Sequence, residues 1–116
     1  MARTVVSSGT QTATITTEHV LLDDTTHEGK VYDAMIDMAN LTSGDVVEIR
    51  LYAKLLVGGT LHRVYYARYG ESQDNENNFK SPIVYVPALT VMKEWKLTLK
   101  QTVGTGRAFD WTVYTD

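Results

Sequence analysis

Apolar and polar residues alternate with a period of two along most of this chain, which is the pattern of half-buried β-strands. In residues 45–56 (DVVEIRLYAKLL) one face is apolar and the opposite face is mostly polar. Residues 91–101 and 108–114 alternate in the same way. The side chains expected to face inward are Val47, Ile49, Leu51, Ala53, Leu55, Val91, Trp95, Leu97, Leu99, Phe109, Trp111 and Val113. Each of these strands therefore has one face toward a core and one toward solvent.

Shorter strands are predicted at residues 12–17, 19–22, 30–38, 61–69 and 83–87. A single helical turn within 31–38 is the alternative for the third of them. Turn residues separate the strands, and Gly58-Gly59 predicts a tight hairpin because both positions tolerate positive φ. Seven or eight short strands predict an all-β protein, with residues 13–116 forming one antiparallel β-sandwich or jelly roll.

Two further segments are candidates for contact with a partner. Residues 1–12 are β-prone but contain Ser, Gly and Thr, so they predict either an edge strand or an arm that pairs with a neighbouring molecule. Residues 70–82 are polar and Asn-rich and predict a surface loop. The candidate interface residues from these segments are Arg3, Thr4, Val5, Val6, Asn75, Asn77 and Phe79.

Composition narrows the possible partners and cofactors. The 116 residues suit one domain, and the net charge of −3 argues against a protein that binds the nucleic-acid backbone. The chain has no cysteine, which excludes disulfides and thiolate metal sites. We find neither a signal-peptide core nor the roughly 20 apolar residues of a membrane span. We therefore expect synthesis in a cytoplasm and no nucleic-acid or membrane partner.

The glycines of residues 102–111 (TVGTGRAFDW) raise the question of a phosphate-binding loop. Such a loop needs a lysine and a Ser or Thr after its second glycine, and a helix must follow. Here Arg107 follows Gly106, and the next residues alternate as a strand. The segment therefore predicts a hairpin turn between two strands. Arg107 could instead lie along the sheet and either cap the aromatic face or pair with a carboxylate.

The other polar residues give no constellation typical of an enzyme or a metal site. His19, His27 and His62 are not spaced as ligands within one element, and no serine lies in a nucleophile elbow. Asp33 and Asp37 are expected on a solvated strand face, and Asp23-Asp24 in a turn. We predict no catalytic residue, no metal and no cofactor.

Three tyrosines fall in one predicted strand, at Tyr65, Tyr66 and Tyr69. Exposed together, or with Trp95, they would form a platform for a sugar ring or a protein partner. The alternative is that Tyr65 and Tyr69 pack inside while Tyr66 contacts a cross-strand neighbour. Tyr66 is therefore also a candidate interface residue.

Four stretches of the chain resemble a family of small virion proteins of tailed bacteriophages. They are TATITTEHVL, MANLTSGDVVEIRLYAKLLVGGT, VYYARY and LTLKQTVGTGRAFDWTVY, and together they extend over nearly the whole chain except the loop at 70–82. The turn TVGTGR followed by aromatic residues is the most specific of these motifs.

The resemblance implies a structural role in a virion, most specifically that of a capsid decoration (cement) protein. It implies a small β-sandwich on the capsid surface that contacts the major capsid protein or other virion subunits and assembles with itself, as a dimer or trimer. It brings no catalytic residues. The alternatives are a place in the tail or neck, or a receptor-binding module that takes a glycan.

Overall fold

The structure, a computed structural model of the chain, describes residues 4–42, 44–70 and 83–115, in which it contains eight β-strands and no helix. In chain order the strands are β1 (Thr4–Thr12), β2 (Glu18–Asp24), β3 (Val31–Asp37), β4 (Val46–Lys54), β5 (His62–Gly70), β6 (Ile83–Thr90), β7 (Glu94–Val103) and β8 (Ala108–Thr115). The all-β prediction is confirmed, and the helical alternative for residues 31–38 is wrong. None of the described segments is a helix that could cross a membrane.

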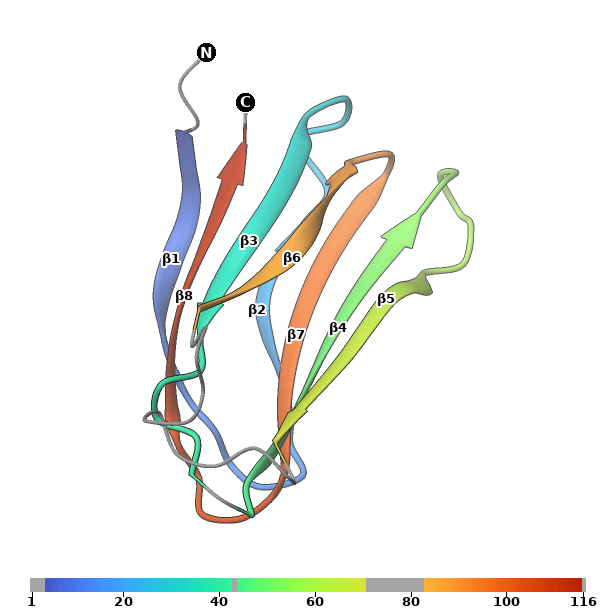
Figure 1. Cartoon of the computed structure of the whole chain (residues 1–116). Coiled ribbons are helices and arrows are strands. Elements are labelled where there is room, and N and C mark those ends of the chain that lie inside the picture. The colour runs from blue at the N-terminus through green and yellow to red at the C-terminus, as the bar shows by residue number, and fades with distance from the viewer. Residues whose placement is uncertain (1–3, 43, 71–82, 116) are drawn as a thin grey trace.

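The strands form two four-stranded antiparallel sheets (Figure 1). Sheet A has the order β1-β8-β3-β6, and sheet B has the order β2-β7-β4-β5. Strand β1 pairs with β8, β2 with β7, β3 with β6, and β4 with β5. The chain thus folds as one long hairpin whose two arms wrap across both sheets. This connectivity is that of a jelly roll, one of the two predicted architectures.

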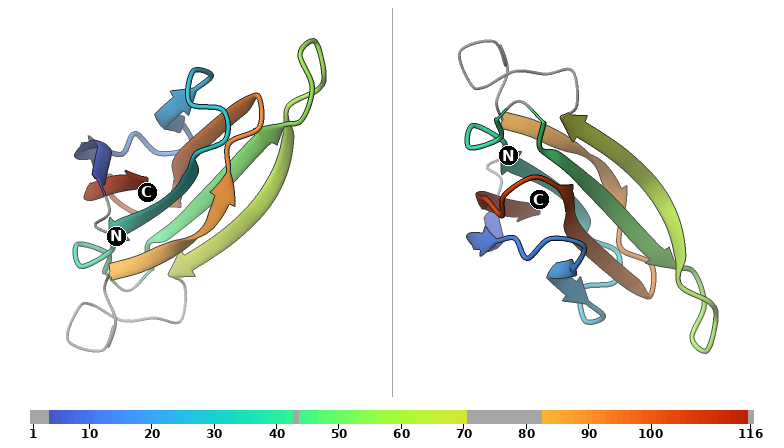
Figure 2. Two further views of the ribbon diagram at one scale, coloured as in Figure 1. Left: turned by 90° about the horizontal axis from the view of Figure 1, so that it is seen from above. Right: turned by 90° about the horizontal axis from the view of Figure 1, so that it is seen from below.

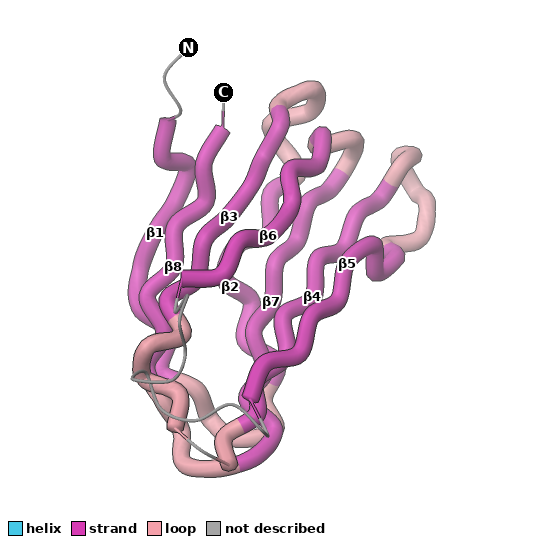
Figure 3. The backbone as a smooth tube through the Cα atoms, in the orientation of Figure 1, coloured by secondary structure: helices cyan, strands magenta, loops and turns pink. Residues whose placement is uncertain are grey.

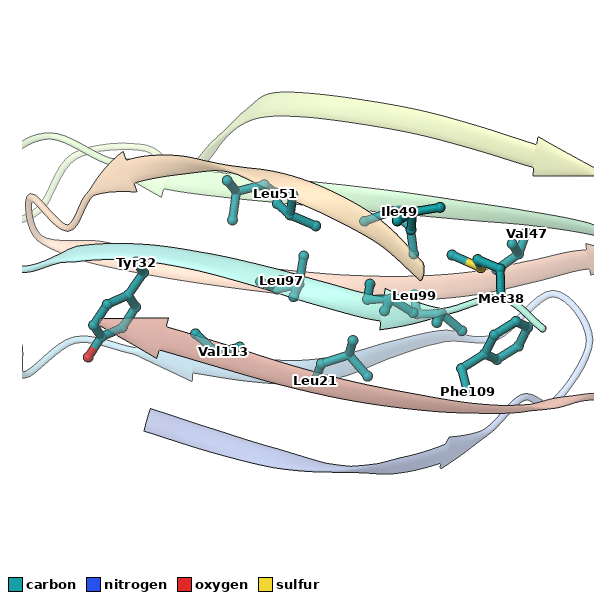
Figure 4. Packing of buried hydrophobic residues seen from close by; sticks show 14 of the residues in the cluster. Leu21, Tyr32, Met38, Val47, Ile49, Leu51, Leu97, Leu99, Phe109 and Val113 are labelled. Atoms are coloured by element: carbon teal, nitrogen blue, oxygen red, sulfur yellow. The ribbon is translucent and has the colours of Figure 1, made fainter. Parts of the chain in front are cut away.

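The core fills the space between the two layers, which Figure 2 shows from both ends. Alternation along β3 places Tyr32, Ala34 and Ile36 on its inner face, where all three are fully buried. Figure 4 shows side chains of the two sheets meeting there, among them Leu51 and Leu97 from sheet B and Val113 from sheet A. Trp111, also predicted to face inward, is partly buried against this core. The predicted inner faces are therefore confirmed within the strands.

The turn at residues 104–107 is not the hairpin that the sequence predicts. Strand β7 lies in sheet B and β8 in sheet A, so the turn crosses from one layer to the other (Figure 3). The reason is that β8 takes its hydrogen-bonding partners from β1 and β3, not from the strand before it. Local turn residues show that the chain reverses, but they do not show which strand it will pair with.

Residues 12–17 were predicted as a strand, and this is also wrong beyond Thr12. The chain crosses here from sheet A to sheet B, and its amides bond to the turn opposite: Ala13 N donates to Arg107 O at 2.8 Å and Thr16 N donates to Gln101 O at 2.8 Å. Thr16 has a positive φ of 67°. Two crossings that lie side by side thus satisfy each other's backbone groups.

Two other turn predictions need correction. Asp23 and Asp24 are the last residues of β2, opposite Lys96 and Trp95, because the turn begins one residue later. Strands β4 and β5 do form a hairpin, but its loop covers residues 55–61 and only Gly58 has a positive φ. Leu55 lies in this loop and is exposed instead of buried.

Candidate functional site

The crossing at residues 104–107 is held by a buried carboxylate, which answers the question that its glycines raise. Asp45 Oδ2 accepts hydrogen bonds from Arg107 Nε at 2.7 Å and from both the backbone N and the Oγ1 of Thr42, at 3.0 and 3.1 Å. Burial alone would raise the pKa of Asp45, but the hydrogen bonds from Arg107 and Thr42 lower it. Of the two roles considered for Arg107, the structure shows the pairing with a carboxylate.

The glycine at position 104 is required by this contact. It has a φ of +99°, and a Cβ built on it would lie 1.9 Å from Asp45 Oδ1. Gln101, fully buried, completes the turn by donating from Nε2 to Thr105 O at 2.8 Å and accepting from Arg107 N at 3.0 Å. The glycine-rich segment is a structural joint between the sheets, since its polar groups are used within the fold.

A second buried carboxylate, Asp24, holds the β2–β3 turn. Its Oδ2 accepts from Tyr32 Oη at 2.6 Å and contacts His27 Nδ1 at 2.7 Å, and its Oδ1 accepts from Thr26 N at 2.7 Å. Burial would raise the pKa of Asp24, but the hydrogen bonds from Tyr32, Thr26 and His27 outweigh it and lower the pKa to about 2. Burial and the neighbouring Asp24 raise the pKa of the Tyr32 hydroxyl. The cluster is therefore a fixed anchor, with the carboxylate ionised and the phenol protonated.

The outer face of sheet B carries a network of paired charges around Tyr66. The Tyr66 hydroxyl donates to Glu48 Oε2 at 2.9 Å, and the guanidinium groups of Arg50 and Arg63 lie 5.2 and 5.1 Å from its ring centre. Arg50 Nη2 also donates to Glu48 Oε1 at 2.6 Å. The hydrogen bond to Glu48 raises the pKa of Tyr66. Tyr66 is exposed, as an interface residue must be, but its polar end is bound within this network.

The sugar platform proposed from Tyr65, Tyr69 and Trp95 does not form. Tyr65 and Tyr69 pack partly buried against the core, and Trp95 is fully buried. The alternation along β5 points the first two inward, which confirms the packing interpretation for them.

The structure describes three of the seven other predicted interface positions, all of them on β1. Thr4 and Val5 are exposed on β1, whereas Val6 packs partly against the core next to a bulge. Residues 4–12 form an edge strand of sheet A, one of the two alternatives for this segment. Arg3, Asn75, Asn77 and Phe79 lie outside the described residues.

The β4–β5 loop presents a prominent apolar surface that the sequence reasoning missed. Leu55, Leu56 and Val57 are 67%, 70% and 85% exposed at its tip, which we call the apolar knob. Figure 2 shows this loop projecting away from the body of the sandwich. Three consecutive aliphatic residues before Gly58 break the alternation, and this break in the sequence pattern could have indicated that the strand ends and the loop is apolar.

A second apolar surface lies on the outer face of sheet A. Two adjoining depressions share Met35 and Tyr114, and their apolar lining also includes Ile83, Tyr85 and Trp111. We call the combined feature the acidic hollow because three aspartates also line it: Asp33, Asp37 and Asp110.

The solvated position predicted for Asp33 is wrong. Tyr85 on the neighbouring strand β6 donates its hydroxyl hydrogen bond to Asp33 Oδ2, and the aspartate is only 7% exposed. The tyrosine side chain accounts for this burial because it comes from the adjacent strand on the same face.

The histidines are separated in the structure. His19 bonds to Gln11 and to the backbone N of Thr14, His27 lies at the Asp24 cluster, and His62 is exposed at the base of the knob. Among the residues that the structure describes, no group of three or more His, Asp or Glu side chains could hold a metal ion.

Searches of protein-family models, curated proteins and solved structures find nothing that matches this chain. The fold and the two apolar surfaces are therefore the structural features that bear on its function.

Proposed function

We propose that this chain is a structural protein of a tailed-bacteriophage virion, most specifically a capsid decoration protein. It would be made in the host cytoplasm and bind the head surface as an oligomer, in contact with the major capsid protein or other virion subunits. The sequence resemblance supports this role. The jelly-roll fold is compatible with it, since viral capsid and lectin domains both use this architecture, although a fold alone does not define a function.

One observation carries the proposal: the sandwich has two separate exposed apolar surfaces. The knob lies at the tip of the β4–β5 hairpin and the hollow on the outer face of the opposite sheet. Contiguous apolar side chains on a protein surface mark sites of contact with other molecules. A subunit of a larger assembly needs contacts in at least two directions, and these surfaces offer them.

The rest of the molecule suits a binding role of this kind. Buried carboxylates at Asp24 and Asp45 fix the turns at the ends of the sheets, so the surfaces are presented by a stiff framework. A standard interface needs only about 800 Å² from each partner. On a lattice, many joined sites strengthen weak single contacts by raising the effective concentration. No catalytic residue is needed.

A receptor-binding module or a tail or neck protein is the alternative. The residues first proposed as a glycan platform are not exposed together, because Trp95 is in the core and Tyr65 and Tyr69 pack against the core. Tyr85 and Tyr114 could replace them beside the aspartates of the hollow. Sheet aromatics next to carboxylates can bind sugars, so a glycan array with purified protein distinguishes this alternative.

The proposal is tested by sedimenting the purified protein with phage heads that lack it. We expect saturable binding at a fixed ratio to the major capsid protein, and no binding to heads of an unrelated phage. A Val57→Ser variant should bind the heads less well if the knob contributes to the contact. Val20→Ser replaces another exposed valine, on sheet B, and should bind the heads as the wild type does. Failure of the wild type to sediment with the heads would overturn the proposal.

A further inference from the structure

The knob is an apolar projection whose aliphatic side chains remain largely exposed. Leu56 and Val57 are 70% and 85% exposed, and the loop backbone is closed by Gly59 N donating to Leu56 O at 2.9 Å. A hairpin that holds aliphatic side chains in water in a fixed turn is organised for insertion into an apolar recess. The question is which recess it enters.

The acidic hollow has an apolar lining that suits aliphatic side chains. Its lining combines Met35 and Tyr114, shared by both depressions, with Ile83 and Tyr85 from β6. Ile83 and Tyr85 are more than half exposed, and Met35 is 39% exposed. The hollow lies on sheet A and the knob extends from sheet B, so a molecule cannot fill its own hollow with its own knob (Figure 1).

Charge also matches the knob of one copy to the hollow of another. The four strands of sheet A contain three aspartates and no lysine or arginine, and all three aspartates line the hollow. The base of the knob carries Lys54, His62 and Arg63, on the strands that the loop connects. Lys54 is 3.3 Å from Glu94, whereas Arg63 stacks on the ring of Tyr66.

We propose that the chain associates with itself by inserting the apolar knob of one copy into the acidic hollow of the next. Arg63 and Lys54 then approach the aspartates at the rim while the aliphatic side chains contact Met35 and the tyrosines. This inference rests on the proposed function for the biological role of the oligomer. The contact between copies can be tested with the purified chain alone. Pairing hollow against hollow is disfavoured because it would bring three carboxylates against three others.

The two contact surfaces differ, so every copy both gives a knob and receives one. Contacts of this kind are heterologous: they form a ring where the rotation between copies closes, and an open filament where it does not. A closed assembly is symmetric and leaves no knob exposed. It would also present the same sheet edges repeatedly around its axis, as a protein on a symmetric capsid requires.

The test uses two variants of the full chain that each remove one side of the contact. Leu56→Ser/Val57→Ser removes the knob, and Met35→Lys places a cation in the hollow. All three positions are exposed, so folding should persist, and circular dichroism checks this. Val20→Ser is the matched control, since Val20 is also about half exposed but lies away from both surfaces.

The mass of each protein is measured by light scattering at high micromolar concentration. We expect the wild type and Val20→Ser to have a mass of at least twice the 13.0 kDa of one chain, and each variant alone to be a monomer. Mixing the two variants should restore pairing as a one-to-one heterodimer, because the knob-deficient copy keeps its hollow and the hollow-deficient copy keeps its knob.

A monomeric wild type would overturn the inference and leave capsid binding to the sedimentation assay. Variants that remain oligomeric like the wild type would overturn the inference as well, since another surface would then hold the copies together. Two monomeric variants that fail to pair on mixing would show that the knob does not enter the hollow. A virion subunit or a glycan that binds the hollow of a monomeric chain would likewise replace the second copy as its partner.

Discussion

Replacing Asp45 with alanine should lower the stability of the whole sandwich, because this carboxylate joins the β3–β4 connection to the crossing between the sheets. The substitution removes the acceptor of two hydrogen bonds from Thr42 and one from Arg107. A neutral bond contributes about 1 kcal/mol, and one to a charged partner about 1.5–3 kcal/mol. Arg107 is 29% exposed and regains part of this by hydration, so we expect a loss of about 3 kcal/mol.

The assay is urea unfolding followed by the fluorescence of the fully buried Trp95. For a domain of this size, the expected loss corresponds to a fall in melting temperature of roughly 10–20 °C. Asp110→Ala is the matched control. Asp110 is exposed and accepts one bond, from Thr10 Oγ1, so its loss should cost less than about 1 kcal/mol.

A double-mutant cycle that combines Asp45→Ala with Arg107→Ala shows whether the ion pair accounts for most of the lost stability. We expect a coupling energy of about 1–2 kcal/mol between positions 45 and 107. If Asp45→Ala costs less than about 1 kcal/mol, or no more than Asp110→Ala, then the crossing is held by something other than this carboxylate, and our explanation of the TVGTGR motif is wrong.

Three further predictions concern the buried carboxylate of the β2–β3 turn, the crossing glycine and the first strand. Because the pKa of Asp24 is lowered from 3.8 to about 2, its stabilisation is present above pH 4 and is lost as the pH falls through 2. Asp24→Asn should flatten the acid limb of the stability curve by about 2 kcal/mol, as measured by urea titrations at several pH values. Gly104→Ala should cost at least about 2 kcal/mol in the same assay. Gly29→Ala, also at positive φ but with nothing within 4 Å, should cost clearly less, and equal costs would disprove the close contact with Asp45. Deleting residues 1–8 removes half of β1 and should lower the melting temperature measured by circular dichroism, whereas an arm that serves only a neighbour would leave it unchanged.

Most of the fold could be predicted from the sequence because burial on one face of each strand imposes a period of two. This is why Val47, Ile49 and Leu51 on β4 were placed correctly. The layer to which a strand belongs was not predictable in the same way. The residues of TVGTGR specify a reversal, but whether β8 pairs with β7 depends on β1 and β3, which are far away in the sequence.

The interaction surfaces were less predictable than the core. The alternating pattern placed Leu55 in the interior, because it continues the period of two along β4. The pattern does not show that the strand has already ended before this residue. The acidic hollow combines strands that are distant in sequence, β3, β6 and β8, so no local pattern indicates it. Tyr66, in contrast, was correctly expected to contact a cross-strand neighbour, because residues opposite each other in paired strands are fixed by register.

The measurement that tests the proposed virion role most directly is the copy number of the chain in purified phage heads, determined by quantitative mass spectrometry. For a decoration protein we predict many copies per head, in a fixed ratio to the major capsid protein that is constant between preparations. Heads that lack the chain, or carry it in trace amounts that vary between preparations, would contradict the proposed function.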